Sequence, residues 1–122
     1  MLKILIIDDD EIIRDALTLM LKQDNHKVTI ATNGEEGISF YKEYKYDLII
    51  TDILMPGKNG IEFLIEMTNL NNTIPIVAMS GGRRAVTSDF NLSSAELLDV
   101  KATLTKPFTI EELKEVIQIA LR

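Results

Sequence analysis

The chain has 122 residues, of which 46% are hydrophobic and 26% charged, and its 13 basic and 19 acidic side chains give a formal net charge of −6. This length corresponds to about one domain, and the composition is that of a globular protein rather than a disordered one. The absence of cysteine excludes disulfides, thiolate metal sites and thiol catalysis.

The charge and the hydropathy pattern also limit the classes of partner. A net charge of −6 argues against nucleic acid as a partner, because nucleic acid is bound mainly through basic contacts to phosphate. No apolar stretch approaches the ~20 residues of a membrane span, and the first residues do not have the layout of a signal peptide. We therefore expect a cytoplasmic protein that binds neither nucleic acid nor membrane.

Five short apolar runs alternate with segments of helical periodicity along the chain. Such runs are typical of buried parallel strands. The pattern predicts an α/β fold of the (βα)5 type, with a doubly wound parallel sheet and right-handed crossovers. The expected strands are Ile4–Ile7, Val28–Ala31, Leu48–Ile50, Ile74–Met79 and Ala102–Thr105.

Between the strands, apolar residues recur at the helical period, and capping residues indicate where helices begin. The first apolar stripe covers Ile12–Leu21, a second helix is expected over Gly34–Glu43 behind an Asn33 N-cap, and a third follows Gly60. The last helix has the clearest start, a capping box over Thr109–Glu112. A further capping-box pattern, Ser93-x-x-Glu96, predicts a short helix over about 94–99.

Three acidic residues directly follow the first apolar run. Asp8, Asp9 and Asp10 crowd like charges at a strand end, which is costly unless a cation or protonation relieves the repulsion. Oxygen ligands without His or Cys favour a hard ion, and a few carboxylates with room for water suit Mg²⁺. The alternative is a solvated acidic cap of the first helix. We expect this second role for Asp10, whereas Asp8 and Asp9 alone leave both possibilities open.

Polar residues also follow three of the later apolar runs. Asp52 follows the third run, and a carboxylate buried there beside a cation would be a positioned nucleophile, although a turn acid is a common alternative. Ser80 ends the fourth run and is followed by Gly81, while Lys106 ends the fifth. Considered separately, Ser80 could be an ordinary turn serine and Lys106 an ordinary surface lysine. Together on successive strand ends, a hydroxyl, an exposed amide and an ammonium suit the oxygens of a transferring phosphoryl group.

These segments together resemble the receiver domain of two-component response regulators along essentially the whole chain. The resemblance is to the CheY-like superfamily, and it implies a flavodoxin-like strand order of 2-1-3-4-5. The matching segments are Ile4–Asp10, Asp47–Gly60, Pro75–Gly81 and Lys106–Phe108. This ordered conjunction is far more specific than any one of the motifs.

The resemblance implies a role for each residue of the predicted site. Asp52 would accept a phosphoryl group from a phosphohistidine on a histidine kinase or a histidine phosphotransfer protein. Asp9, Asp52 and the Leu54 carbonyl would bind Mg²⁺, with Asp8 acting through water. Ser80, the Gly81 amide and Lys106 would hold the phosphoryl oxygens. The Lys106–Pro107 peptide bond would be cis, and a downstream protein would bind the face of the fourth helix, fifth strand and last helix.

Two departures from the family pattern fall near that output face. Many members have an aromatic residue three positions before the lysine, whereas this chain has Thr103, so the output surface is expected to signal differently. The segment from Ser80 to Lys106 is several residues longer than usual, and Asp99-Val100 stands where the family has a Gly-Ala pair.

Two other classes of function compete with this interpretation. A Mg²⁺-dependent phosphohydrolase would need an acid two residues after its nucleophile, but position 54 is Leu, which disfavours turnover. An interaction scaffold of the same fold would have a degenerate site, yet all members of the expected set are present. The single histidine, His26, lies in a polar turn and is expected to be exposed. We therefore predict that residues 1–122 form a stand-alone receiver, a phosphorylation switch rather than a turnover enzyme.

Overall fold

A computed structural model describes residues 1–53, 60–81 and 100–122 of the chain. The predicted helix over 94–99 lies outside the described residues, as does the Leu54 carbonyl.

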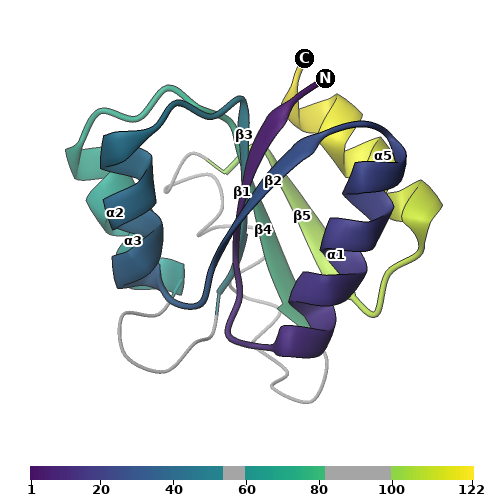
Figure 1. Cartoon of the computed structure of the whole chain (residues 1–122). Helices are drawn as coiled ribbons and strands as arrows, with labels where there is room; N and C mark the ends of the chain where they lie inside the picture. Colours follow the sequence, from purple (N-terminus) through teal and green to yellow (C-terminus); the bar gives the residue numbers. More distant parts are fainter. Residues whose placement is uncertain (54–59, 82–99) are drawn as a thin grey trace.

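The centre of the molecule is a five-stranded parallel sheet in the order β2-β1-β3-β4-β5 (Figure 1). This order is the predicted 2-1-3-4-5, and it confirms the α/β doubly wound fold. The strands are β1 (Lys3–Ile7), β2 (Lys27–Ala31), β3 (Leu48–Asp52), β4 (Ile76–Gly81) and β5 (Ala102–Lys106).

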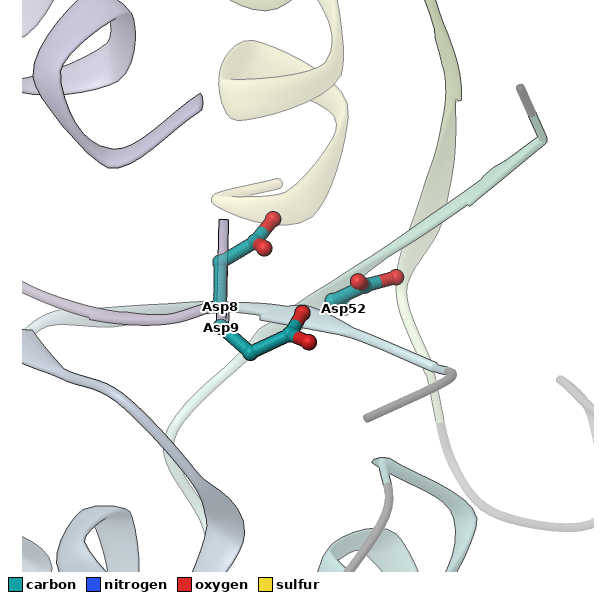
Figure 2. A group of neighbouring side chains, drawn as sticks. All are labelled: Asp8, Asp9 and Asp52. Carbon is teal, nitrogen blue, oxygen red and sulfur yellow. The ribbon is translucent and has the colours of Figure 1, made fainter. Parts of the chain in front are cut away.

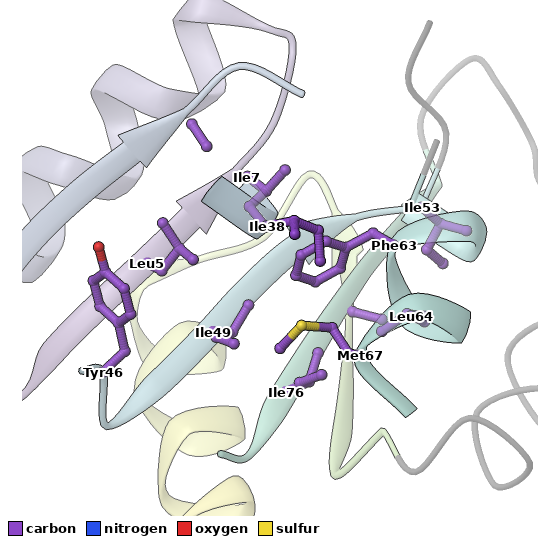
Figure 3. Packing of buried hydrophobic residues seen from close by; sticks show 12 residues of the cluster. Leu5, Ile7, Ile38, Tyr46, Ile49, Ile53, Phe63, Leu64, Met67 and Ile76 are labelled. Atoms are coloured by element: carbon purple, nitrogen blue, oxygen red, sulfur yellow. The ribbon is translucent and has the colours of Figure 1, made fainter. Parts of the chain in front are cut away.

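The described helices cover the sheet in two layers, with α2 and α3 on one face and α1 and α5 on the other (Figure 1). Side chains alternate along each strand, so one buried cluster includes Leu5, Ile49 and Phe63, and the other includes Ile4, Ile50 and Leu113. Figure 3 shows the first cluster, in which helix α3 packs on the sheet. The helices are α1 (Glu11–Gln23), α2 (Gly34–Glu43), α3 (Gly60–Asn69) and α5 (Ile110–Ala120).

The predicted capping residues begin three of these helices. The Asp10 side chain caps α1 by accepting the Ile12 amide at 2.9 Å, which confirms the helix-cap role expected for this acid. Asn33 caps α2, and the Thr109 capping box of α5 is complete, with both reciprocal hydrogen bonds formed. These local signals fix where each helix starts and therefore where each preceding strand ends.

Two local predictions were wrong. Strand β4 begins at Ile76 rather than Ile74, because the Asn72 side chain bonds both the amide and the carbonyl of Ile74 and holds it in a turn. His26 is half-buried rather than exposed, since its Nδ1 accepts the Leu2 amide at 3.0 Å and ties the turn to the N-terminus.

Candidate functional site

The register of the sheet brings the predicted site residues to one edge. Ile7 pairs with Thr51, so the next residues, Asp8 and Asp52, lie side by side at the carboxyl ends of β1 and β3. Asp52 in turn pairs with Met79, which places Ser80 one step further along β4, and Gly81 pairs with Lys106. In open α/β sheets this edge is where ligands bind.

Three carboxylates gather at this edge. Asp8, Asp9 and Asp52 each offer an oxygen, and these three atoms lie within 4.8 Å of one another. Figure 2 shows their side chains next to each other at the ends of β1 and β3. Asp8 is fully buried and Asp52 only 6% exposed, so water screens their repulsion poorly. The arrangement is therefore costly unless positive charge or protonation relieves the repulsion.

Lys106 supplies part of that charge by reaching back from the end of β5. Its Nζ lies 2.9 Å from Asp8 Oδ2 and 3.3 Å from Asp52 Oδ2, so a single ammonium bridges two of the acids. With three carboxylates and one lysine, this group retains a formal surplus of negative charge. The remaining charge is of the sign that would attract a cation.

The pKa shifts of Asp8 and Lys106 show how burial and charge pairing compete. Burial raises the pKa of Asp8 above 3.8, and this effect outweighs the lowering by the Asp10 amide and by Lys106. Burial also opposes the charged form of Lys106, but the hydrogen bond to Asp8 and the charges of both acids raise its pKa above 10.5. The lysine is therefore held charged, whereas ionised Asp8 is held at a cost to the metal-free fold.

Backbone contacts fix the orientation of both buried acids. Asp8 Oδ1 accepts the Asp10 amide at 2.9 Å, and Asp52 Oδ1 accepts the Ile53 amide at 2.8 Å. Arg14 of α1 donates from Nη1 to the Asp8 carbonyl at 3.0 Å. Sequence reasoning missed Arg14, because a single arginine within the first helix carries no signal of a contact with the preceding strand. These contacts hold the carboxylates in place before any ligand arrives.

The other predicted residues differ in how far the structure describes them. Ser80 is buried at the end of β4, and its Oγ has no hydrogen-bond partner among the described residues. A buried hydroxyl without a partner is costly in a folded protein unless a ligand or water satisfies it.

The Gly81 backbone belongs to β4, whereas Leu54 lies outside the described part of the chain. The Lys106–Pro107 bond is cis, as the resemblance implied.

The donor set fits Mg²⁺. The three clustered side chains present only carboxylate oxygens, which are the ligands that this small, hard ion prefers. The strand ends that hold these acids also hold the Lys106 ammonium and the Ser80 hydroxyl, which has no hydrogen-bond partner among the described residues.

Comparison with known proteins agrees with this geometry. The sequence model of the response regulator receiver domain matches residues 4–118. The chain belongs to this family. Receiver domains are phosphorylation-dependent switches of two-component signalling that use Mg²⁺, and the chain is a member of that class of signalling protein.

Individual relatives support the same assignment. The chain is 35% identical over 121 residues to the uncharacterized transcriptional regulatory protein YkoG of Bacillus subtilis, covering 98% of this chain and 50% of that protein. It is 32% identical over 121 residues to the regulatory protein VanRB of Enterococcus faecalis, covering 99% and 53%. The chain therefore spans about half the length of these two relatives.

A solved structure matches over its full length. The chemotaxis protein CheY4 of Vibrio cholerae superposes with a TM-score of 0.86 at 28% identity, covering 99% of both chains. Within the described residues of this receiver domain, no helix is long and apolar enough to span a membrane.

Proposed function

We propose that this receiver domain accepts a phosphoryl group on Asp52 from a phosphohistidine of a histidine kinase or a histidine phosphotransfer protein. The observation that carries the proposal is the buried Asp52 carboxylate, which lies beside Asp8 and within 3.3 Å of the Lys106 ammonium. In the transfer, a carboxylate oxygen of Asp52 forms a bond to phosphorus, and the phosphorus–nitrogen bond of the donor imidazole breaks. The imidazole retains the electron pair of that bond.

The residues around Asp52 would each support this step. The Ile53 amide holds Asp52 Oδ1, so the carboxylate is oriented before reaction. Lys106 and the Ser80 hydroxyl, with the Gly81 amide, would contact the phosphoryl oxygens and spread the charge that develops there. Moving Lys106 from Asp8 to the phosphoryl group would leave Asp8 without its ammonium, which couples phosphorylation to the local charge balance.

Mg²⁺ would be held by Asp9, Asp52 and the Leu54 carbonyl, with Asp8 acting through water. When bound, the ion would neutralise the acids and the phosphoryl oxygens that approach them. The convergence of three carboxylates supports this ligand set, and Leu54 enters it from the family resemblance alone.

We propose that residues 1–122 act as one receiver unit in the cytoplasm, that the unit is a switch rather than a turnover enzyme, and that it signals to a downstream protein. The expected output face combines the fourth helix, whose predicted position lies outside the described residues, with β5 and α5. In it, Thr103 is half-buried and pairs with Ala78 of β4. That the protein acts as a stand-alone receiver stays a prediction.

Phosphoramidate tests the transfer step, because it has the phosphorus–nitrogen bond of a phosphohistidine. With Mg²⁺ present, the wild type should become phosphorylated, as followed on a phosphate-affinity gel, whereas Asp52→Asn should not. Asp47→Asn is the matched control, since Asp47 precedes β3 at the opposite edge of the sheet and binds the Lys3 amide. Labelling of Asp52→Asn at the wild-type rate would contradict the proposal.

A further inference from the structure

A cavity lies at the edge of the sheet opposite the acidic site. Its volume is about 260 Å³, and it opens where β1 and β2 begin and where the chain enters β3. The side chains that line it are mainly cationic, aromatic or hydroxyl-bearing: Lys3, Lys27, Lys45, Tyr44, Tyr46 and Thr29. Nothing in the receiver chemistry proposed above uses this cavity.

Three lysines around one cavity are unexpected in a chain with a net charge of −6. Lys3 and Lys27 are the first residues of β1 and β2 and pair directly in the parallel register, so their side chains leave the same face of the sheet. Like charges on facing positions of neighbouring strands repel. Within the described residues, no carboxylate lines the cavity and none of the three lysines forms an ion pair.

The acidic residue bonded to this region is already engaged. Asp47 Oδ2 accepts the Lys3 backbone amide at 2.8 Å, so this carboxylate is bonded to the main chain rather than to a lysine side chain. Glu43 lies close enough to Tyr46 to act on its hydroxyl electrostatically, but it does not line the cavity. The three ammonium groups are therefore available to an external anion.

The tyrosines give the cavity an apolar wall. Tyr46 is 9% exposed and packs with the core cluster on the α2 and α3 face, and burial raises the pKa of its hydroxyl. Tyr44 follows α2 and is 56% exposed, so its ring forms part of the cavity on the solvent side. An exposed ring beside ammonium groups suits a ligand that has both an anionic group and a flat surface.

We propose that this cavity, lined by Lys3, Lys27 and Lys45, is a binding site for a small phosphate-bearing anion. The lysines contact the phosphate, and Tyr44 offers its ring to a planar group of the ligand, whereas the Thr29 side chain is hydrogen-bonded to Tyr46 in the cavity wall. Binding relieves the repulsion between the paired lysines. The site is separate from Asp52, because it lies at the amino ends of the strands rather than at their carboxyl ends.

Amide NMR of the intact chain tests the proposal, with pyrophosphate as the first probe. The buffer contains EDTA and constant NaCl, so that metal at the acidic edge and changes in ionic strength do not contribute. Saturable shifts are expected at Lys3, Lys27, Thr29 and Lys45. The double variant Lys3→Ala/Lys27→Ala should weaken binding by about tenfold or more, since it removes two charge-assisted contacts.

The matched control is Lys22→Ala, which removes the same charge from an exposed position in the last turn of α1, outside the cavity. It should bind pyrophosphate like the wild type. Equal weakening in Lys22→Ala and in the double variant Lys3→Ala/Lys27→Ala, or shifts that rise linearly without saturation, would show general charge attraction and overturn the site.

ADP as a second probe tests the contribution of the ring. Stacking on Tyr44 should make ADP bind roughly fivefold or more tightly than pyrophosphate, and Tyr44→Ala should remove that difference while pyrophosphate binding persists. An equal affinity of the wild type for both probes would overturn the assignment of Tyr44 to a planar group.

Discussion

The two edges of the same sheet hold charged groups in opposite ways. At the carboxyl edge, Asp8 and Asp52 are buried and share one ammonium, so each charge depends on a specific neighbour. At the amino edge, Lys3 and Lys27 repel each other but are exposed, so water screens the repulsion. Equal charge changes should therefore have much larger effects at the carboxyl edge than at the amino edge.

The largest effect on stability is expected at Lys106. Lys106→Met leaves two buried carboxylates without their cation, and it should lower the free energy of unfolding by about 3 kcal/mol in EDTA. Lys45→Met, the matched change at the exposed amino edge, should stay within about 0.5 kcal/mol of the wild type. Urea unfolding followed by circular dichroism measures both, and similar losses would remove the contrast between the edges.

Magnesium should stabilise the fold through the carboxyl edge alone. At about 100 times its dissociation constant, an ion that binds only the folded state adds roughly 2.7 kcal/mol to the free energy of unfolding. Asp9→Ala should lose this increment, because Asp9 is a proposed direct ligand. Lys3→Ala/Lys27→Ala should retain it in full. Thermal melts with and without Mg²⁺ give the comparison, and an unchanged increment in Asp9→Ala contradicts the ligand set.

The pH dependence of metal-free stability should reveal the cost of burying Asp8. Its folded-state pKa is raised, so protonated Asp8 favours folding below about pH 3.8, and that contribution is lost as the pH rises through the raised pKa. Asp8→Asn should therefore gain stability relative to the wild type as the pH increases from acid to neutral. Urea midpoints of both proteins in EDTA across that pH range would detect this gain. If the stability of Asp8→Asn relative to the wild type falls toward neutral pH, the expected direction is wrong.

The smallest effect is expected from the lysine pair at the amino edge. Lys27→Glu replaces a facing like charge with an opposite one beside Lys3, and it should stabilise the fold by at most about 0.5 kcal/mol. Lys45→Glu makes the same reversal of charge at a position outside the strands and should stabilise the fold by less. High salt should reduce the gain of Lys27→Glu, since both side chains are exposed. A gain that persists in 1 M NaCl would mean that the pair is less exposed to solvent than the structure indicates.

The acidic edge could be predicted because strand ends fix it. Asp8 and Asp52 directly follow apolar runs, and the carboxyl ends of parallel strands meet at one edge whatever the loops do. The contact of Lys106 with Asp8 could not be predicted, because it depends on how a long side chain folds back across two strands. Burial of Asp8, which decides the direction of its pKa, also requires the packed structure.

The amino edge gave no sequence signal. Lys3, Lys27 and Lys45 are far apart along the chain and each resembles an ordinary surface lysine. Only the register of β1 with β2, and the path of the chain into β3, brings them around one cavity. The late start of β4 also gave no signal in the apolar pattern, because the Asn72 side chain competes locally with the strand for the Ile74 backbone.

Asp52 is the proposed phosphoacceptor, and this role can be measured as a gain in intact mass after incubation with Mg²⁺ and acetyl phosphate. The wild type and the amino-edge control Asp47→Asn should each gain one phosphoryl group that hydroxylamine removes, whereas Asp52→Asn should gain none. Equal labelling of Asp52→Asn and the wild type, or a wild type that stays unlabelled with Mg²⁺ present, would show that Asp52 is not the phosphoacceptor.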